Sequence, residues 1–146
     1  MDPTTLVSRD RVESAGELLK RLPAEGLVTR GALWSRVEGD GQPYLYIITP
    51  NAEHEGQIEA NLRLGRALRE FQKGVTDLFR RLDPYEIKLI GPSDPLAQGV
   101  LDLYQEWPDD RPTYHQGSVL GTVSIDGAYI YPAKMFAPPP PLAQPA

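Results

Sequence analysis

Two pairs of short apolar segments, each joined by a turn sequence, constrain the fold of this chain more than any other feature. The paired segments are residues 28–37 with 44–49 and residues 119–125 with 128–131. A cluster rich in glycine and acidic residues at 38–42 separates the first pair, and Asp126-Gly127 separates the second. Asp-Gly between apolar segments is typical of a two-residue hairpin turn. The sequence therefore predicts two β-hairpins, and a further strand over 85–90.

Three other segments carry the apolar spacing of a helix: residues 13–22, 52–82 and 95–106. The longest has an apolar or small residue at every third or fourth position, which predicts one stripe made of Ile58, Leu62, Gly65, Leu68, Phe71, Val75, Leu78 and Leu82. Glycine inside a helix costs about 1 kcal/mol relative to alanine, so we expect a bend or break near Gly74. The stripe could also pair with a second copy, although two heptads are too few to identify a coiled coil.

The predicted order of elements is helix, strand, strand, helix, strand, helix, strand, strand. The fold class we expect is therefore α+β, with an antiparallel or mixed five-stranded sheet and helices packed mainly on one face. A chain of 146 residues corresponds to one domain. The periodic region sets the expected boundaries: a flexible N-terminus at 1–12, a single α+β domain at 13–132 and a disordered proline-rich tail at 133–146.

The composition excludes several kinds of chemistry. The chain has no cysteine, so it can form no disulfide or thiolate metal site and cannot use thiol catalysis. Its first residues, MDPTTLVSRDRVES, lack the apolar core of a secretory signal, and no apolar run is long enough to span a membrane. We therefore expect a cytoplasmic protein with no membrane partner and no cofactor.

The charge balance argues against nucleic acid as the main partner. The formal net charge is −5 and the isoelectric point is near 5.0, whereas most nucleic-acid-binding proteins present a basic stripe. The longest helical segment does carry a basic cluster, made of Arg63, Arg66, Arg69, Lys73, Arg80 and Arg81. Glu59, Glu70 and Asp77 interrupt this cluster, so we interpret it as a solvated helix face with internal charge pairs.

The hairpin registers sort the strand residues onto two faces. A two-residue turn at Asp126-Gly127 opposes Ser124 to Tyr129, and in the first hairpin we take Arg36 to oppose Tyr44. One face is then aliphatic and meets the helices. The other is aromatic and polar, and we expect a protein-binding face there, formed by Trp34, Arg36, Tyr44, Tyr46, Lys88, Tyr129 and Tyr131. Tyrosine and tryptophan suit interfaces because they combine a large apolar ring with a polar tip.

Two other interpretations of this aromatic face stay open. The rings could cover one another across the strands, or lie beneath the loop at 108–117 or the proline-rich tail. They could instead stack nucleic-acid bases, as in single-strand binding proteins. The acidic balance and the single neighbouring arginine, Arg36, disfavour that interpretation.

Two local patterns suggest ligands but have simpler explanations. His54 lies among acidic residues, Glu53, Glu55 and Glu59. Acids at a helix N-terminus are explained by the helix dipole, so we predict no metal site. The turn at 91–93 precedes a helix and could hold an anion. Asp94, however, is expected to cap that helix and would repel a phosphate.

Four blocks of the sequence carry a resemblance: Gly31-Ala32-Leu33-Trp34, Tyr44-Leu45-Tyr46-Ile47, Lys88-Leu89-Ile90-Gly91-Pro92-Ser93-Asp94-Pro95 and Gly127-Ala128-Tyr129-Ile130-Tyr131-Pro132. In this order they resemble a group of uncharacterised bacterial proteins of similar length. The resemblance covers about residues 13–132 and not the tail. It implies a compact fold and a prokaryotic cytoplasmic setting, and it provides no activity, substrate or catalytic residue to transfer.

The sequence favours a non-enzymatic protein-binding or assembly module, with a second copy or another protein docked on the aromatic face. One alternative is a small hydrolase or nuclease-like enzyme that uses acidic residues with His54 or His115. Asp109 and Asp110 share a loop with His115 and Tyr114, and a carboxylate beside a histidine is the raw material of acid–base catalysis. The other alternative is a nucleic-acid accessory protein. The prolines at 138–141 are expected to act as a spacer.

Overall fold

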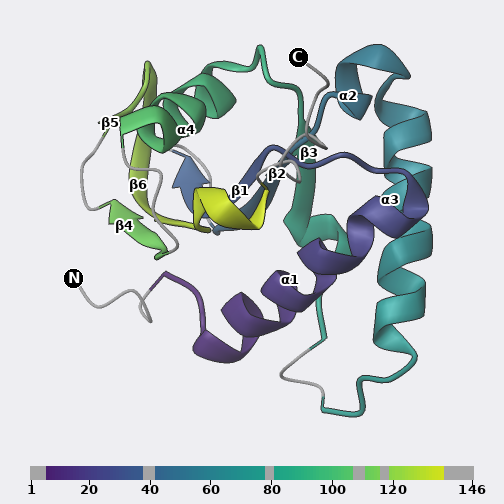
Figure 1. Cartoon of the computed structure of the whole chain (residues 1–146). Helices are drawn as coiled ribbons and strands as arrows, with labels where there is room; N and C mark the ends of the chain where they lie inside the picture. Colours follow the sequence, from purple (N-terminus) through teal and green to yellow (C-terminus); the bar gives the residue numbers. More distant parts are fainter. Residues whose placement is uncertain (1–5, 38–41, 78–80, 107–110, 116–118, 137–146) are drawn as a thin grey trace, which may run out of the picture.

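A mixed β-sheet with helices on both faces forms the body of the molecule (Figure 1). The computed structural model describes residues 6–37, 42–77, 81–106, 111–115 and 119–136. The sheet order is β3-β2-β1-β6-β4, with β5 paired to β6. The strands are β1 (Gly31–Val37), β2 (Tyr44–Ile48), β3 (Ile87–Ile90), β4 (Thr113–His115), β5 (Val119–Leu120) and β6 (Val123–Ile130).

The α+β class is confirmed, and the sheet is mixed because β2 and β3 pair in parallel while the other strands pair antiparallel. It has six strands, one more than predicted. The added strand, β4, lies in a segment predicted to be a loop. The parallel pair requires a crossover connection, which α2 (Asn51–His54) and α3 (Gln57–Gln72) supply.

Two hydrophobic cores lie on opposite faces of the sheet. On one face, α1 (Arg9–Arg21) and α3 pack against the inward side chains of β1, β2 and β3. On the other face, α4 (Pro95–Glu106) packs against β1, β2 and β6. Figure 1 shows α4 near β6, away from α1 and α3. None of the described helices is long and apolar enough to cross a membrane.

Described elements also lie on either side of residues 13–132. Helix α1 begins at Arg9 rather than Glu13, because Ser8 accepts a hydrogen bond from the Arg11 amide and caps it. At the other end, a short 3₁₀ helix, η5 (Ala133–Met135), follows β6, and Phe136 stacks on Tyr104 with ring centroids 6.3 Å apart. Residues 1–5 and the prolines at 138–141 lie outside the described residues.

The predicted hairpin turn at Asp126-Gly127 is wrong. Strand β6 runs straight through this dipeptide, and the turn lies at Gly121-Thr122, where Leu120 opposes Val123. Gly127, with φ of 80°, forms a β-bulge instead: Ala128 opposes Ser35, whereas Ile125 opposes Val37. A glycine with positive φ fits a bulge as well as a turn. The dipeptide alone could not distinguish them.

The predicted helix over 52–82 is divided. Gly56, with φ of 93°, separates α2 from α3, and α3 ends at Gln72, close to the break predicted near Gly74. A 3₁₀ helix, η4 (Pro84–Glu86), then leads into β3. Another, η2 (Leu22–Glu25), follows α1. One side of α3 packs against a face of the sheet, so the opposite side of the helix faces solvent.

Candidate functional site

The seven residues predicted to form one aromatic face lie on both faces of the sheet, so that prediction is wrong. The first hairpin pairs Ser35, not Arg36, with Tyr44. A slip of one residue moves every side chain of a strand to the opposite face. Trp34 therefore shares a face with Leu45, and Tyr46 lies on the other face with the α4 core.

Trp34 and Tyr131 are buried in the core beneath α1. The Trp34 indole Nε1 donates to the Tyr131 hydroxyl at 3.1 Å, and that hydroxyl donates to the carbonyl oxygen of Val12 at 2.7 Å. Burial raises the pKa of Tyr131 far above its usual value. These two rings are structural and are not available to a partner.

Tyr129 and Tyr114 continue this aromatic row toward the surface. The Tyr129 ring makes edge contacts with Tyr131 at 5.1 Å and with Tyr114 at 5.0 Å between centroids. Burial, together with the neighbouring Tyr114, raises the pKa of Tyr129 to about 12. Tyr114 is 49 % exposed. The interpretation that the rings cover one another thus describes this group well.

Lys88, Tyr44 and Tyr46 form a separate group on the opposite face. The Lys88 ammonium lies 4.0 Å from the centroid of the Tyr44 ring and 5.9 Å from that of Tyr46, a cation–π arrangement. Tyr46 itself is buried. Arg36 lies elsewhere and pairs with Asp126 at 3.3 Å. The predicted residues therefore form three small groups rather than one surface.

Among the described residues, two large aliphatic side chains are exposed together on the outer side of α3. Ile58 is 78 % exposed and Leu62 is 52 % exposed. Gly65 follows on the same side, and a Cβ added there would meet no heavy atom within 4 Å. We call Ile58, Leu62 and Gly65 the α3 stripe. Apolar side chains gathered on one helix face, opposite its buried side, mark an interaction surface more often than scattered ones do.

The spacing of apolar residues along α3 could have predicted this surface. Residues Ala60, Leu64, Ala67 and Phe71 are spaced as one helix face and are all buried. Ile58 and Leu62 lie on the opposite side of the same helix, because a residue advances the helix by about 100°. The predicted single stripe merged the two sides, since it joined Ile58 and Leu62 to the buried Leu68.

The α3 stripe leads into an open, basic groove. The groove has a volume of about 420 Å³ and is lined by Gly65, Leu68, Arg69, Gln72, Lys73, Arg81 and Pro84. Gln72 fixes its wall, because it accepts from Arg81 Nε at 3.0 Å and donates to the Leu82 carbonyl oxygen at 2.9 Å. Three of the predicted basic-cluster residues line this groove, whereas Arg80 lies outside the described residues.

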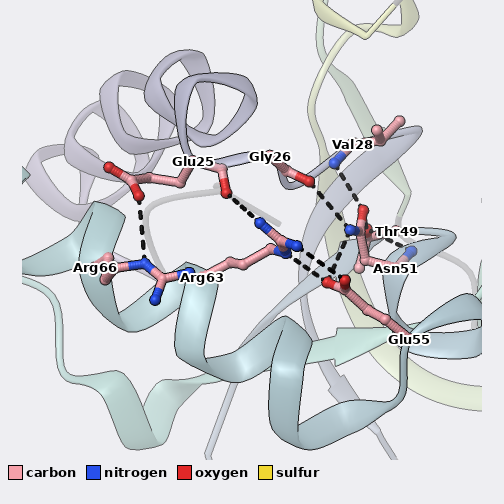
Figure 2. A network of polar contacts seen from close by, with 8 residues as sticks. All are labelled: Glu25, Gly26, Val28, Thr49, Asn51, Glu55, Arg63 and Arg66. Carbon is pink, nitrogen blue, oxygen red and sulfur yellow. Dashed lines mark hydrogen bonds and ion pairs between the residues drawn. The ribbon is translucent and has the colours of Figure 1, made fainter.

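A network of polar contacts holds α3 in place against η2, the short helix that follows α1 (Figure 2). Arg63 donates to both carboxylate oxygens of Glu55, at 2.6 and 3.1 Å, and to the carbonyl oxygen of Glu25 at 3.1 Å. Arg66 pairs with the Glu25 carboxylate at 3.5 Å. Arg63 and then Asn51 lower the pKa of Glu55. A forked arginine–carboxylate pair is geometrically specific, so this network sets the orientation of α3.

Asn51 connects the same network to the segment before β1. Its amide oxygen accepts from the Val28 amide at 2.9 Å, and its amide nitrogen donates to the Gly26 carbonyl oxygen at 3.1 Å and to Glu55 at 3.0 Å (Figure 2). Backbone groups outside the sheet are thereby satisfied. This network fixes the orientation in which the α3 stripe faces solvent.

Residues that were considered for catalysis, metal binding or anion binding have partners within the chain. His115 Nε2 lies 2.7 Å from the carbonyl oxygen of Val119. The carboxylate of Glu53 accepts from the Ser93 amide at 3.1 Å and from its hydroxyl at 2.8 Å, so the turn considered for an anion holds a carboxylate of the chain itself. Asp109 and Asp110 lie outside the described residues. Across the described ranges, no three histidine or acidic residues gather to hold a metal ion.

No family model, curated protein or solved structure matches this chain. The resemblance to a group of bacterial proteins therefore stays a prediction.

Proposed function

We propose that this protein is a non-enzymatic protein-binding module, and that its binding surface is the α3 stripe together with the adjoining basic groove. The observation that supports the proposal is the exposure of Ile58 and Leu62 on one side of α3, a helix that is anchored on its other sides by its core contacts and by the polar contacts of Arg63 and Arg66. Full burial of an isoleucine or leucine side chain contributes about 1.5–3 kcal/mol. A cytoplasmic location in a bacterium, expected from the composition and the resemblance, is part of the same proposal.

The chemistry of this surface fits a polypeptide partner better than a nucleic acid or a small molecule. An apolar centre with charged residues at its rim is the usual arrangement of a protein interface. Here Leu62 and Gly65 form the centre, and Arg69, Lys73 and Arg81 form one rim. The protein as a whole carries a net charge of −5. That charge opposes the long-range attraction on which nucleic-acid binding depends.

The test compares two substitutions of apolar residues with equal exposure. Leu62 is 52 % exposed on α3, and Val119 is 51 % exposed on β5. Affinity-tagged wild type, Leu62→Glu and Val119→Glu are used to capture proteins from the native host, and bound proteins are quantified by mass spectrometry. We expect a partner that binds wild type and Val119→Glu equally and is lost with Leu62→Glu. Identical profiles for all three proteins would contradict the proposal.

A further inference from the structure

The outer face of α3 places an exposed leucine three residues before a glycine with open space above it. Ile58, Leu62, Gly65 and Arg69 follow at intervals of four, three and four residues, which is the spacing of a helix-pairing seam. Leu62 projects from this seam, whereas Gly65 leaves open space where a side chain would stand. If two copies of α3 lie antiparallel, each Leu62 fits over Gly65 of the other copy.

The charges on this face favour the same antiparallel arrangement. Glu59 is exposed in the first turn of α3, and Arg69 and Lys73 are exposed at its other end. Lys73 pairs with the neighbouring Glu70 at 2.8 Å, which leaves Arg69 as the cation nearest the seam. An antiparallel pair brings Glu59 of each copy beside Arg69 of the other. A parallel pair would place like charges together, which is destabilising. The antiparallel arrangement has two-fold symmetry and therefore closes as a dimer.

We propose that the partner on the α3 stripe is a second copy of this chain, bound through an antiparallel α3–α3 contact. This inference rests on the proposed function, because it uses the same surface and specifies its occupant. The groove beside Gly65 then receives apolar side chains from the first turns of the other α3. Arg69 at its rim meets an acidic residue that the chain itself provides.

The size of the surface sets the expected affinity. Helix α3 has 16 residues and is therefore about 24 Å long, at a rise of 1.5 Å per residue. A contact along one helix of this length lies at or below the lower end of the roughly 1,200–2,000 Å² buried in stable interfaces. We therefore expect a reversible dimer with a dissociation constant in the micromolar range, about 1 μM or weaker.

The first experiment measures the mass of the untagged protein by sedimentation equilibrium over a wide range of concentration. We expect wild type to pass from monomer to dimer as concentration rises. Leu62→Glu and Gly65→Leu should each raise the dissociation constant about tenfold or more, since they act at the centre of the contact. Val119→Glu is the control and should leave it unchanged. Far-ultraviolet circular dichroism verifies that every variant is folded.

The second experiment reverses the charges. Glu59→Arg alone and Arg69→Glu alone should each weaken the dimer, because each places like charges across the two-fold axis. The double variant exchanges the two charges within the chain and should restore most of the affinity. A surface built for a different protein would not be restored in this way.

The outcomes separate this inference from the proposed function. A protein that stays monomeric at every concentration, or a dimer indifferent to Leu62→Glu, overturns the inference. If a host protein still binds and Leu62→Glu abolishes that binding, the proposed function stands. The α3 stripe then binds a different protein and not a second copy of this chain. If Leu62→Glu affects neither association, both proposals fall.

Discussion

The hydroxyl of Tyr131 joins the sheet to α1 through a short chain of hydrogen bonds. It accepts from the Trp34 indole and donates to the carbonyl oxygen of Val12. All three groups lie in the core on the α1 side of the sheet. A buried polar group that loses its partner keeps the full cost of desolvation, whereas an exposed group recovers water as a partner. The contribution of the Tyr131 hydroxyl to the stability of the fold therefore depends on its burial.

Tyr131→Phe should lower the free energy of unfolding by about 1–3 kcal/mol, because the buried Trp34 N–H loses its acceptor while the ring still fills its space. Urea denaturation followed by tryptophan fluorescence measures the change. Tyr114→Phe is the matched control, since its ring lies at the exposed end of the same aromatic row, and it should have little effect. Equal effects of the two substitutions would show that the internal hydrogen bond contributes nothing.

Apolar periodicity predicted most helices and strands, but not the register between strands. Register depends on where a turn closes, and Asp126-Gly127 has the chemistry of both a turn and a bulge. The turn at 38–42 is longer than two residues, so its length did not determine which residues of the first two strands oppose each other. The observed register differs from the predicted one by one residue, and in it Trp34 lies in the core. Binding surfaces that depend on strand register were therefore harder to predict than the helices.

Alanine substitutions at two glycines are expected to change the stability of the fold in opposite directions. Gly127→Ala should destabilise the fold by about 1–2 kcal/mol, because alanine must adopt the positive φ of the bulge. Gly65→Ala should stabilise it by about 0.5–1 kcal/mol, because this glycine lies inside α3 with open space around it. Thermal or urea unfolding of dilute protein measures both. If Gly127→Ala were neutral, the bulge conformation would not require glycine.

A short segment of the chain connects the helices that pack on the two faces of the sheet. In α2, Glu53 holds the turn before α4 through both donors of Ser93. Glu55, one residue after α2, holds Arg63 of α3. Helix α4 belongs to one core and α3 to the other. Two carboxylates that are two residues apart in the chain thus connect helices that do not share a core.

Both carboxylates have a pKa below 4.5, that of Glu53 because of Ser93 and that of Glu55 because of Arg63 and then Asn51. A lowered pKa in the folded state means that the unfolded state binds protons more readily as pH falls. Their contribution to stability is therefore fully present well above pH 4.5 and is lost as pH falls through the lowered values. We expect the urea midpoint of wild type to fall over this range.

The substitution that tests this coupling is Glu53→Gln combined with Glu55→Gln. The double variant should be less stable than wild type at neutral pH, and its urea midpoint should depend less on pH below about 4.5. Glu17→Gln is the control, since that side chain is 60 % exposed and pairs with Lys20 on the surface of α1, where ion pairs contribute little. If the double variant and wild type lost stability in parallel as pH falls, other carboxylates would carry the acid sensitivity and the tie between the two layers would not depend on these charges.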